Sequence, residues 1–290
     1  MTPEPTVPTS LAGIGATALG VAVLRAQESS RPDRLFDDPY ARHFLQAVDP
    51  ASSPWSAGAS PATAGFLRLM AEQVAVRTRF LDRALLEAAG RGCDQVVLLA
   101  SGMDARAFRL AWPPGTKVFE LDFADVLAFK TAVLDGRGAT AACHRVEVAT
   151  DLRQDWPRAL TESGFDPARP AAWLAEGILY ALPPEAADLL LDRITGLSAP
   201  ASMLALDHME DSELLRSARA DISAELVGLW RGGPTENLDA WLTRRGWQPA
   251  VTVIADAAAA CERPVPPAFD PAHAAAGRGW LATARLPKPL

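Results

Sequence analysis

Residues Asp94–Asp122 read DQVVLLASGMDARAFRLAWPPGTKVFELD. The stretch begins with an uninterrupted apolar run that predicts a buried strand, and it continues through a tight turn into a short helix. It ends in a second apolar run followed by an acidic residue. This order of strand, turn, helix, strand and acid is half of a nucleotide-binding α/β fold.

The turn after the first strand, Ala100–Asp104, contains one glycine, Gly102. A dinucleotide-binding fingerprint carries three glycines, because the backbone must turn tightly and approach a pyrophosphate closely. The turn therefore predicts a pocket for a nucleoside without a pyrophosphate. Among common cofactors this favours S-adenosylmethionine over NAD.

Asp122 lies twenty residues after Gly102. At that spacing a carboxylate at the end of the second strand can reach both ribose hydroxyls of a nucleoside held over the first strand. The alternative is an ordinary strand–helix–strand unit in which Asp122 or Asp125 only caps the next helix. The spacing alone leaves both interpretations open.

Two further acids follow predicted strands. Asp151 comes after the third strand, where a carboxylate can accept the exocyclic amine of adenine while Leu152 packs on the ring; its alternative role is a helix cap. Glu176 and Gly177 end the fourth strand. Ligands of open α/β sheets bind at the carboxyl ends of strands, so this position also predicts a binding residue.

Beyond this unit, strands and helices alternate along the chain, which predicts a mostly parallel sheet. The last two strands are expected to close its edge as a hairpin-like pair. Predicted strands cover 95–100, 117–121, 145–149, 171–175, 202–207, 248–254 and 280–286, and predicted helices cover 41–47, 64–89, 105–110, 125–135, 185–195, 212–229 and 235–245.

Composition narrows the function classes. The 290 residues are 49% hydrophobic, enough for a sizeable core near the upper size of one domain. The net charge of -7 is spread without a basic stripe, so we expect no nucleic-acid partner.

Cys93, Cys143 and Cys261 show no metal-ligand spacing, which predicts no metal site and a reducing, cytoplasmic location. The uncharged run 11–24 lacks a basic flank and is too short to span a bilayer, so we expect an N-terminal helix and no membrane contact.

Seven short motifs occur in one order along the chain, and together they resemble the leucine carboxyl methyltransferase family. The resemblance is closest to the actinobacterial S-adenosylmethionine-dependent branch and extends from about Thr17 to Trp247. The motifs are TALGVAVLRAQES (17–29), DPYA (38–41), RTRFLD (77–82), LLASGMDAR (98–106), FELDFADVLAFK (119–130), DL (151–152) and WLAEGILYALP (173–183).

The resemblance implies a class I methyltransferase, Rossmann-like fold. Its mostly parallel seven-stranded sheet would have helices on both faces and an N-terminal helical cover over the cofactor. We expect a disordered terminus at 1–9, a cover at 10–92 that leads into the core, and an S-adenosylmethionine-binding core at 93–290. A helical insertion on the substrate side is expected near 208–234.

The same resemblance implies a cofactor site. Arg77 would pair with the methionine carboxylate, since a guanidinium fork matches a carboxylate well, although Arg79 competes for this role. Arg25 would be a second basic contact from the cover. The backbone at Ala100 and Gly102 would line the methionine portion, Asp122 would bind the ribose, Asp151 and Leu152 the adenine, and Glu176 the amino-acid end.

Three positions depart from the family pattern. Ala100 stands where the family has glycine, and Ala105 stands where the family's Asp-Thr-Arg has threonine, which makes the turn slightly bulkier. The family's tyrosine after the Glu-Gly motif falls one place later than Tyr180. Methyl transfer is an in-line displacement in which positioning supplies much of the rate, and only a hydroxyl acceptor calls for a base. The catalytic residue is therefore not identified; His208 and Tyr180 are the candidates.

We therefore expect an S-adenosylmethionine-dependent O-methyltransferase acting on a carboxyl or hydroxyl group of a small molecule, with a role in natural-product metabolism of the polyketide type. An NAD-dependent oxidoreductase is the alternative enzyme class, because it would share the strand–helix–strand unit and Asp122. A protein that binds S-adenosylmethionine without catalysis is a third possibility, supported by Ala100. The sequence predicts no oligomeric state.

Overall fold

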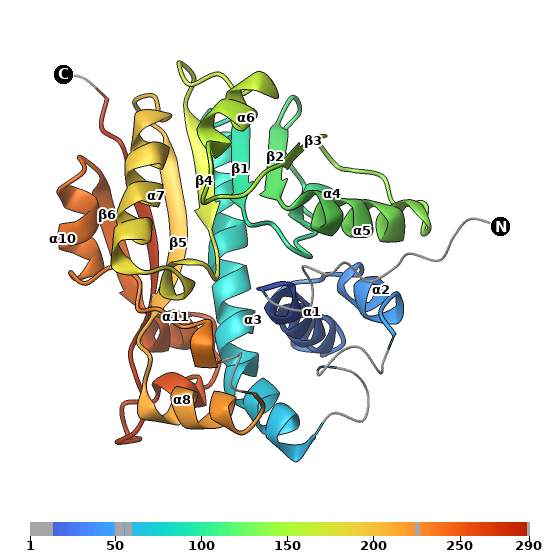
Figure 1. The fold of residues 1–290 in the computed structure, drawn as a ribbon, viewed down its shortest axis with the longest axis vertical. Coiled ribbons are helices and arrows are strands. Elements are labelled where there is room, and N and C mark those ends of the chain that lie inside the picture. The colour runs from blue at the N-terminus through green and yellow to red at the C-terminus, as the bar shows by residue number, and fades with distance from the viewer. Residues whose placement is uncertain (1–13, 50–54, 56–59, 224–226, 289–290) are drawn as a thin grey trace.

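A computed structural model describes residues 14–49, 55, 60–223 and 227–288 (Figure 1). The disorder expected at 1–9 lies outside these residues. The sheet has seven strands in the order β3-β2-β1-β4-β5-β7-β6. The strands are β1 (Gln95–Leu99), β2 (Lys117–Asp122), β3 (His144–Ala149), β4 (Ala171–Ala175), β5 (Met203–Met209), β6 (Gln248–Val253) and β7 (Gly279–Arg285).

The predicted α/β fold is confirmed. The five strands β3, β2, β1, β4 and β5 are parallel, whereas β7 pairs antiparallel with both β5 and β6. The last two strands pair as predicted, with β7 placed between β5 and β6. In the register, Val97 of β1 lies beside Phe119 of β2 and Trp173 of β4, so the carboxyl ends of these strands meet at one edge. This edge carries the loops that begin at Ala100 and Glu176.

Helices cover both faces of the sheet. On one face, α6 (Trp156–Glu162), α7 (Pro184–Gly196) and α10 (Leu238–Thr243) bury a shared apolar cluster with alternate strand residues. The opposite face carries α3 (Pro61–Gly90), α4 (Arg106–Arg109) and α5 (Ala124–Asp135). The strands β1, β4 and β5 are buried throughout, as expected for central strands covered on both faces.

The helices α1 (Ile14–Ser29) and α2 (Ala41–Gln46) lie below the carboxyl ends of the strands in Figure 1, beside α3. The two halves of α3 have different partners. Leu67 and Met70 pack into the cluster that includes α1, whereas Leu81 and Leu85 pack against the sheet. The predicted cover and core therefore share one continuous helix, and the boundary expected at 92 falls just after that helix ends.

Some predicted helices differ in extent. The helix expected over 212–229 is interrupted. Its first part, α8, covers Glu213–Ala220, and the Ser212 side chain caps it at the Leu215 N–H. Residues 221–223 lie outside α8, and 227–228 are helical again. Among the described residues, two α-helices were not predicted. They are α6, which contains only Trp156 and Leu160 as buried residues, and α11 (Ile254–Ala260), formed by the alanine-rich tract. In the described ranges, none of the helices has the length and hydropathy needed to cross a membrane.

Candidate functional site

The turn after β1 has two residues in the left-handed region. Ala100 has φ +50° and Gly102 has φ +46°. For alanine this conformation costs roughly 1–2 kcal/mol relative to the right-handed region. At Gly102 a side chain would also crowd the cover, because a Cβ there would lie 3.1 Å from the Cβ of Ala18 in α1. The turn therefore accommodates the methyl group of Ala100, whereas the positive φ and the tight approach of α1 both favour glycine at 102.

Asp122 joins the end of β2 to this turn. Its Oδ2 accepts a hydrogen bond from the Gly102 N–H at 2.7 Å, and its Oδ1 accepts one from the Phe123 N–H at 2.8 Å. Burial raises the pKa of this carboxyl above its ordinary value. Asp122 thus contacts the turn and Phe123, the N-cap residue of α5. The Asp122 side chain does not cap the helix, because the N-cap position of α5 makes no side-chain cap hydrogen bond. Each carboxylate oxygen has a second lone pair that can accept a ribose hydroxyl.

Glu176, at the end of β4, lies among three arginines from three helices. Its carboxylate is 2.9 Å from Arg25 Nη2 of α1, 3.0 Å from Arg77 Nε of α3 and 2.6 Å from Arg106 Nη1 of α4. Burial alone would raise the pKa of Glu176, but the three guanidinium groups outweigh it and lower the pKa. Glu176 is therefore ionised and joins the cover to the sheet.

Arg77 has a second carboxylate partner. Its Nη1 lies 3.1 Å from Oδ2 of Asp207 in β5, and Asp207 Oδ1 accepts a hydrogen bond from the Gly177 N–H at 2.6 Å. Arg77 is 2% exposed, whereas Arg79 is exposed to solvent. Of the two competing arginines, the structure brings Arg77 to Glu176.

Sequence reasoning missed Arg106 and Asp207 as parts of this cluster. Arg106 is fully buried, binds Asp82 through Nε at 2.6 Å and also pairs with Asp104. The sequence did carry a signal for Arg106, because this residue is the last one of the LLASGMDAR motif. Asp207 immediately precedes the candidate His208, and only the pairing of β4 with β5 brings it beside Gly177.

The cluster retains hydrogen-bonding capacity for an incoming anion. Arg25 Nε and Arg106 Nη2 are buried and, among the described residues, have no hydrogen-bond partner, whereas Arg77 Nε already faces Glu176 Oε1 at 3.0 Å. Buried N–H groups without partners cost free energy, and a carboxylate is the group that a guanidinium binds best. Arg25 and Arg106 therefore have N–H groups available to donate to a carboxylate, such as the one at the amino-acid end of S-adenosylmethionine.

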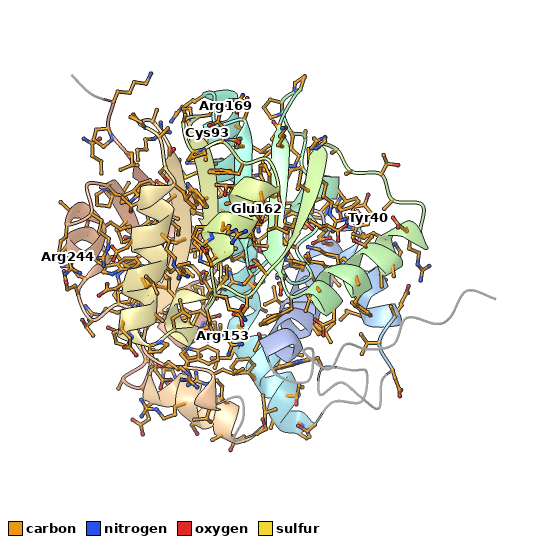
Figure 2. All side chains as sticks on the ribbon, turned by 45° about the horizontal axis from the view of Figure 1, so that its top comes forward. Tyr40, Cys93, Arg153, Glu162, Arg169 and Arg244 are labelled. Atoms are coloured by element: carbon orange, nitrogen blue, oxygen red, sulfur yellow. The ribbon has the colours of Figure 1, made fainter. Side chains whose placement is uncertain are left out.

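Asp151 is already engaged by a neighbour. Arg153 binds its carboxylate at 2.6 Å and lowers the pKa of Asp151. Arg153 lies below the strands in the view of Figure 2. Leu152 is half-buried and packs against the cluster under α6 and α7. An adenine amine bound at Asp151 would share this carboxylate with Arg153.

The two catalytic candidates lie in different surroundings. His208 stacks on Trp280 with 5.9 Å between ring centroids, and burial lowers its pKa to about 4. Tyr180 belongs to the short 3-10 helix η3 (Leu179–Ala181), and burial raises its pKa to about 12. A Cβ at Gly177 would lie 3.4 Å from the Tyr180 hydroxyl and 3.7 Å from Arg77 Nη1. Tyr180 is thus beside the arginine cluster.

Lys130 of α5 contacts the turn that follows β1. Its Nζ lies 2.9 Å from Glu120 Oε2 and 3.2 Å from both the Ser101 hydroxyl and the Asp104 carbonyl oxygen. Lys130 and Glu120 are both fully buried. The FELDFADVLAFK motif therefore supplies both partners of a buried ion pair that fixes the turn.

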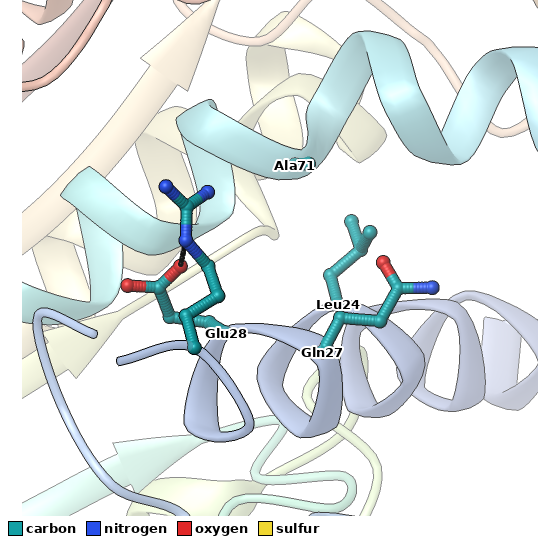
Figure 3. A pocket seen from close by; sticks show the side chains of 5 residues that line it. Leu24, Gln27, Glu28 and Ala71 are labelled. Atoms are coloured by element: carbon teal, nitrogen blue, oxygen red, sulfur yellow. Dashed lines mark ion pairs between the residues drawn. The ribbon is translucent and has the colours of Figure 1, made fainter. Parts of the chain in front are cut away.

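A cavity of about 230 Å³ opens between α1 and α3 (Figure 3). No predicted cofactor residue lines it. Its only drawn ion pair, between Arg31 and Glu28, spans 3.7 Å. The residues around it are Leu24, Gln27, Glu28, Arg31 and Ala71.

Comparison with known structures shows the same fold. A protein from Thermobifida fusca named as a methyltransferase has a TM-score of 0.58 and 17% identity, over 98% of this chain and 100% of its own. An O-methyltransferase family protein from Burkholderia thailandensis has a TM-score of 0.50 and 14% identity, over 77% of this chain and 60% of its own. At these identities the likeness concerns the fold alone.

Sequence relatives are much closer. A protein from Frankia alni named as an S-adenosyl-L-methionine-dependent methyltransferase is 46% identical over 257 residues, which cover 88% of this chain and 91% of the relative. One from Saccharopolyspora erythraea, named in the same way, is 43% identical and covers 95% and 96%. Residues 18–195 match the leucine carboxyl methyltransferase family. With this match and these relatives, the chain belongs to the leucine carboxyl methyltransferase family.

Proposed function

We propose that the protein is an S-adenosylmethionine-dependent O-methyltransferase that methylates a carboxyl or hydroxyl oxygen of a small molecule in natural-product metabolism of the polyketide type. The observation that carries the proposal is Glu176, held by Arg25, Arg77 and Arg106 beside the left-handed turn. The names of the relatives support the cofactor. The free thiols of Cys93, Cys143 and Cys261 support a reducing, cytoplasmic location.

Different residues would bind different parts of the cofactor. Arg77 and Arg25 would hold the methionine carboxylate, and Glu176 would hold the amino group. Asp122 would accept the ribose hydroxyls. The bound cofactor supplies an electrophilic methyl group on a sulfonium. Ala100 and Gly102 would line the methionine portion, and Asp151 and Leu152 the adenine.

The chain's own contribution to the rate is mainly positioning. With a pKa of about 4, His208 is neutral at pH 7 and is a weak base. Tyr180, with a pKa of about 12, keeps its proton and can donate a hydrogen bond beside Arg77. The cover and the buried arginines would hold the cofactor away from bulk water, so an acceptor oxygen placed in line with the methyl group needs little further assistance.

Titration calorimetry tests the cofactor. The protein should bind S-adenosylmethionine and S-adenosylhomocysteine and release no heat with NAD. Heat with NAD alone would identify the oxidoreductase alternative. A labelled-methyl assay over small carboxylic acids and phenols then tests catalysis, because cofactor binding without transfer to any of them would favour the non-catalytic alternative.

A further inference from the structure

Arg263 is a buried cation that lies outside the cofactor cluster and 235 positions from its partner Glu28. Its side chain is 4% exposed. Nη2 lies 2.6 Å from Glu28 Oε2 of α1, Nη1 lies 2.8 Å from Asp33 Oδ2, and Nε lies 3.2 Å from Glu72 Oε2 of α3. One arginine therefore holds three acids from three segments of the cover: α1, the connection from α1 to α2, and α3.

The backbone fixes Arg263 at the end of α11. The Arg263 N–H donates to the Ala258 carbonyl at 2.9 Å, and the Glu262 N–H donates to the Ala259 carbonyl at 3.0 Å. These two hydrogen bonds form a Schellman motif, whose left-handed residue is Glu262 with φ +55°. A residue other than glycine is strained in this region by roughly 1–2 kcal/mol, and such strain is concentrated at ligand clamps and switch regions.

The C-terminal half of α1 carries two ion-pairing residues about one turn apart. Arg25 binds Glu176 at the end of β4, and Glu28 binds Arg263. The helix itself packs against α2 and α3. Near Glu28 the contact between α1 and α3 is interrupted by the cavity of Figure 3, which Glu28 and Arg31 line. Charged contacts therefore contribute much of what holds this end of α1 in place.

The proposed cofactor residues beneath α1 are enclosed. The side chain of Glu176 is 9% exposed and already lies among three guanidinium groups, so an ammonium group can reach it only after one of them changes partner. Arg77 and Arg106 are each held by a further buried carboxylate. Arg25 has Glu176 as its only ion-pair partner among the described contacts. Arg25 is therefore the cation that can leave, and it moves with α1.

We propose that Arg263 is a positioning residue for cofactor binding. With the three acids that bind it, Arg263 forms a latch that keeps α1 closed over the site, and cofactor exchange requires this latch to open. The inference rests on the proposed function, which places the cofactor beneath α1. Opening the latch allows Arg25 to exchange Glu176 for the carboxylate of the cofactor. Because one opening equilibrium precedes both entry and exit, a weaker latch speeds both steps.

The test is the binding kinetics of S-adenosylhomocysteine to the full-length protein, followed by stopped-flow tryptophan fluorescence. Trp55 reports on α1, because a Cβ at Gly20 of this helix would lie 3.1 Å from its ring. Arg263→Gln should raise the association and the dissociation rate constants together, each by about fivefold. Loss of a direct cofactor contact would raise the dissociation rate constant alone.

Two outcomes separate the latch from the proposed function. If S-adenosylhomocysteine binds the wild type but its association rate constant does not rise in Arg263→Gln, the latch proposal is wrong. If S-adenosylhomocysteine does not bind the wild type at all, the proposed function is contradicted instead.

Arg245→Gln is the matched control. The side chain of Arg245 is 12% exposed and joins two acids of α7, Asp188 and Asp192, away from the cover. Its loss should lower the free energy of unfolding without changing either rate constant. An equal rise of both rate constants in Arg245→Gln would show that the effect of Arg263→Gln comes from general destabilisation, and would refute the latch.

Partner variants test the same contact from the other side. Glu28→Gln should also raise both rate constants, and the double variant with Arg263→Gln should be little faster than Arg263→Gln, since both changes remove one interaction. Arg263→Lys keeps the charge but lacks the fork that reaches three acids, so its rate constants should be intermediate. Fully multiplicative effects of Glu28→Gln and Arg263→Gln would show that the two residues do not act as one latch.

Hydrogen exchange measures the latch without a ligand. The backbone amides of 21–29 in α1 should exchange faster in Arg263→Gln than in Arg245→Gln, because the end of α1 opens more often when the latch is lost. Equal exchange of these amides in the two variants would show that Arg263 does not hold the helix.

Discussion

Arg25 of the cover helix and Glu176 at the end of β4 are 151 positions apart in sequence, and their side chains meet at 2.9 Å. Both are buried, so this ion pair closes the cover over the carboxyl edge of the sheet. A cofactor bound at Glu176 would lie beneath α1, and its binding would depend on the position of that helix.

Arg25→Gln should therefore weaken S-adenosylhomocysteine binding by about tenfold, because one charge-assisted contact to the amino-acid end is lost. Calorimetry measures the change. Arg42→Gln is the control, since Arg42 is exposed on α2 and its side chain contacts Ser30. Equal affinities of the two variants would show that Arg25 does not contact the cofactor.

Asp122→Ala should reduce S-adenosylhomocysteine affinity by about 100-fold, since the ribose loses both of its proposed hydrogen bonds and Gly102 loses its partner. Asp125→Ala, at an exposed position in α5, should have little effect on the affinity. Retained affinity in Asp122→Ala would mean that the ribose is bound elsewhere, even if the variant were less stable.

Ala100→Gly should stabilise the protein by up to about 1 kcal/mol, because glycine adopts φ +50° without the strain that alanine carries. Ala128→Gly on the exposed face of α5 should instead destabilise it by roughly 0.5–1 kcal/mol. Urea unfolding compares the two variants. The same sign for both would show that the turn holds no strain at Ala100.

Stability between pH 4 and pH 6.5 should depend on His208. Its pKa is about 4 in the folded protein and about 6.5 in an unfolded chain, so in this window the unfolded state binds the proton first and folding is disfavoured as the pH falls. The free energy of unfolding of the wild type should fall by up to roughly 3 kcal/mol between pH 6.5 and pH 4 because of His208, and His208→Gln should not show this fall. The measurement is urea unfolding at several pH values. The control is His273→Gln at an exposed position, which should keep the wild-type dependence of stability on pH. The same pH dependence in His208→Gln as in the wild type would contradict the expectation.

Lys130→Met should destabilise the protein by about 3 kcal/mol, because Glu120 remains fully buried with Arg145 as its only remaining cationic partner among the described contacts. The double variant with Glu120→Gln should lose less than the two single variants together, since the removed groups interact. Strictly additive losses in chemical denaturation would show that the pair makes no joint contribution.

Local pattern in the sequence was sufficient for the strands and most helices. The apolar run of β1, the lone glycine of the turn and the end of β2 at Asp122 lie within thirty residues of one another. The structure confirms both strands and places Gly102 in the turn between β1 and α4 with φ +46°. The predicted ribose contact of Asp122 stays a prediction. The short helices α6 and α11 were missed because they bury few residues and carry weak periodicity. Arg77 was distinguished from Arg79 only by its burial against Glu176 and Asp207.

The sequence alone therefore determined the fold class, the order of the motifs and the residue types available to a cofactor. Only the tertiary structure decided which charges meet. Arg25, Arg106 and Glu176 come from three distant segments, and Arg263 meets Glu28 across 235 positions of sequence. Strand periodicity is a property of neighbouring residues, whereas ion pairing depends on distances that exist only after the sheet has aligned its strand ends and α1 has closed over them.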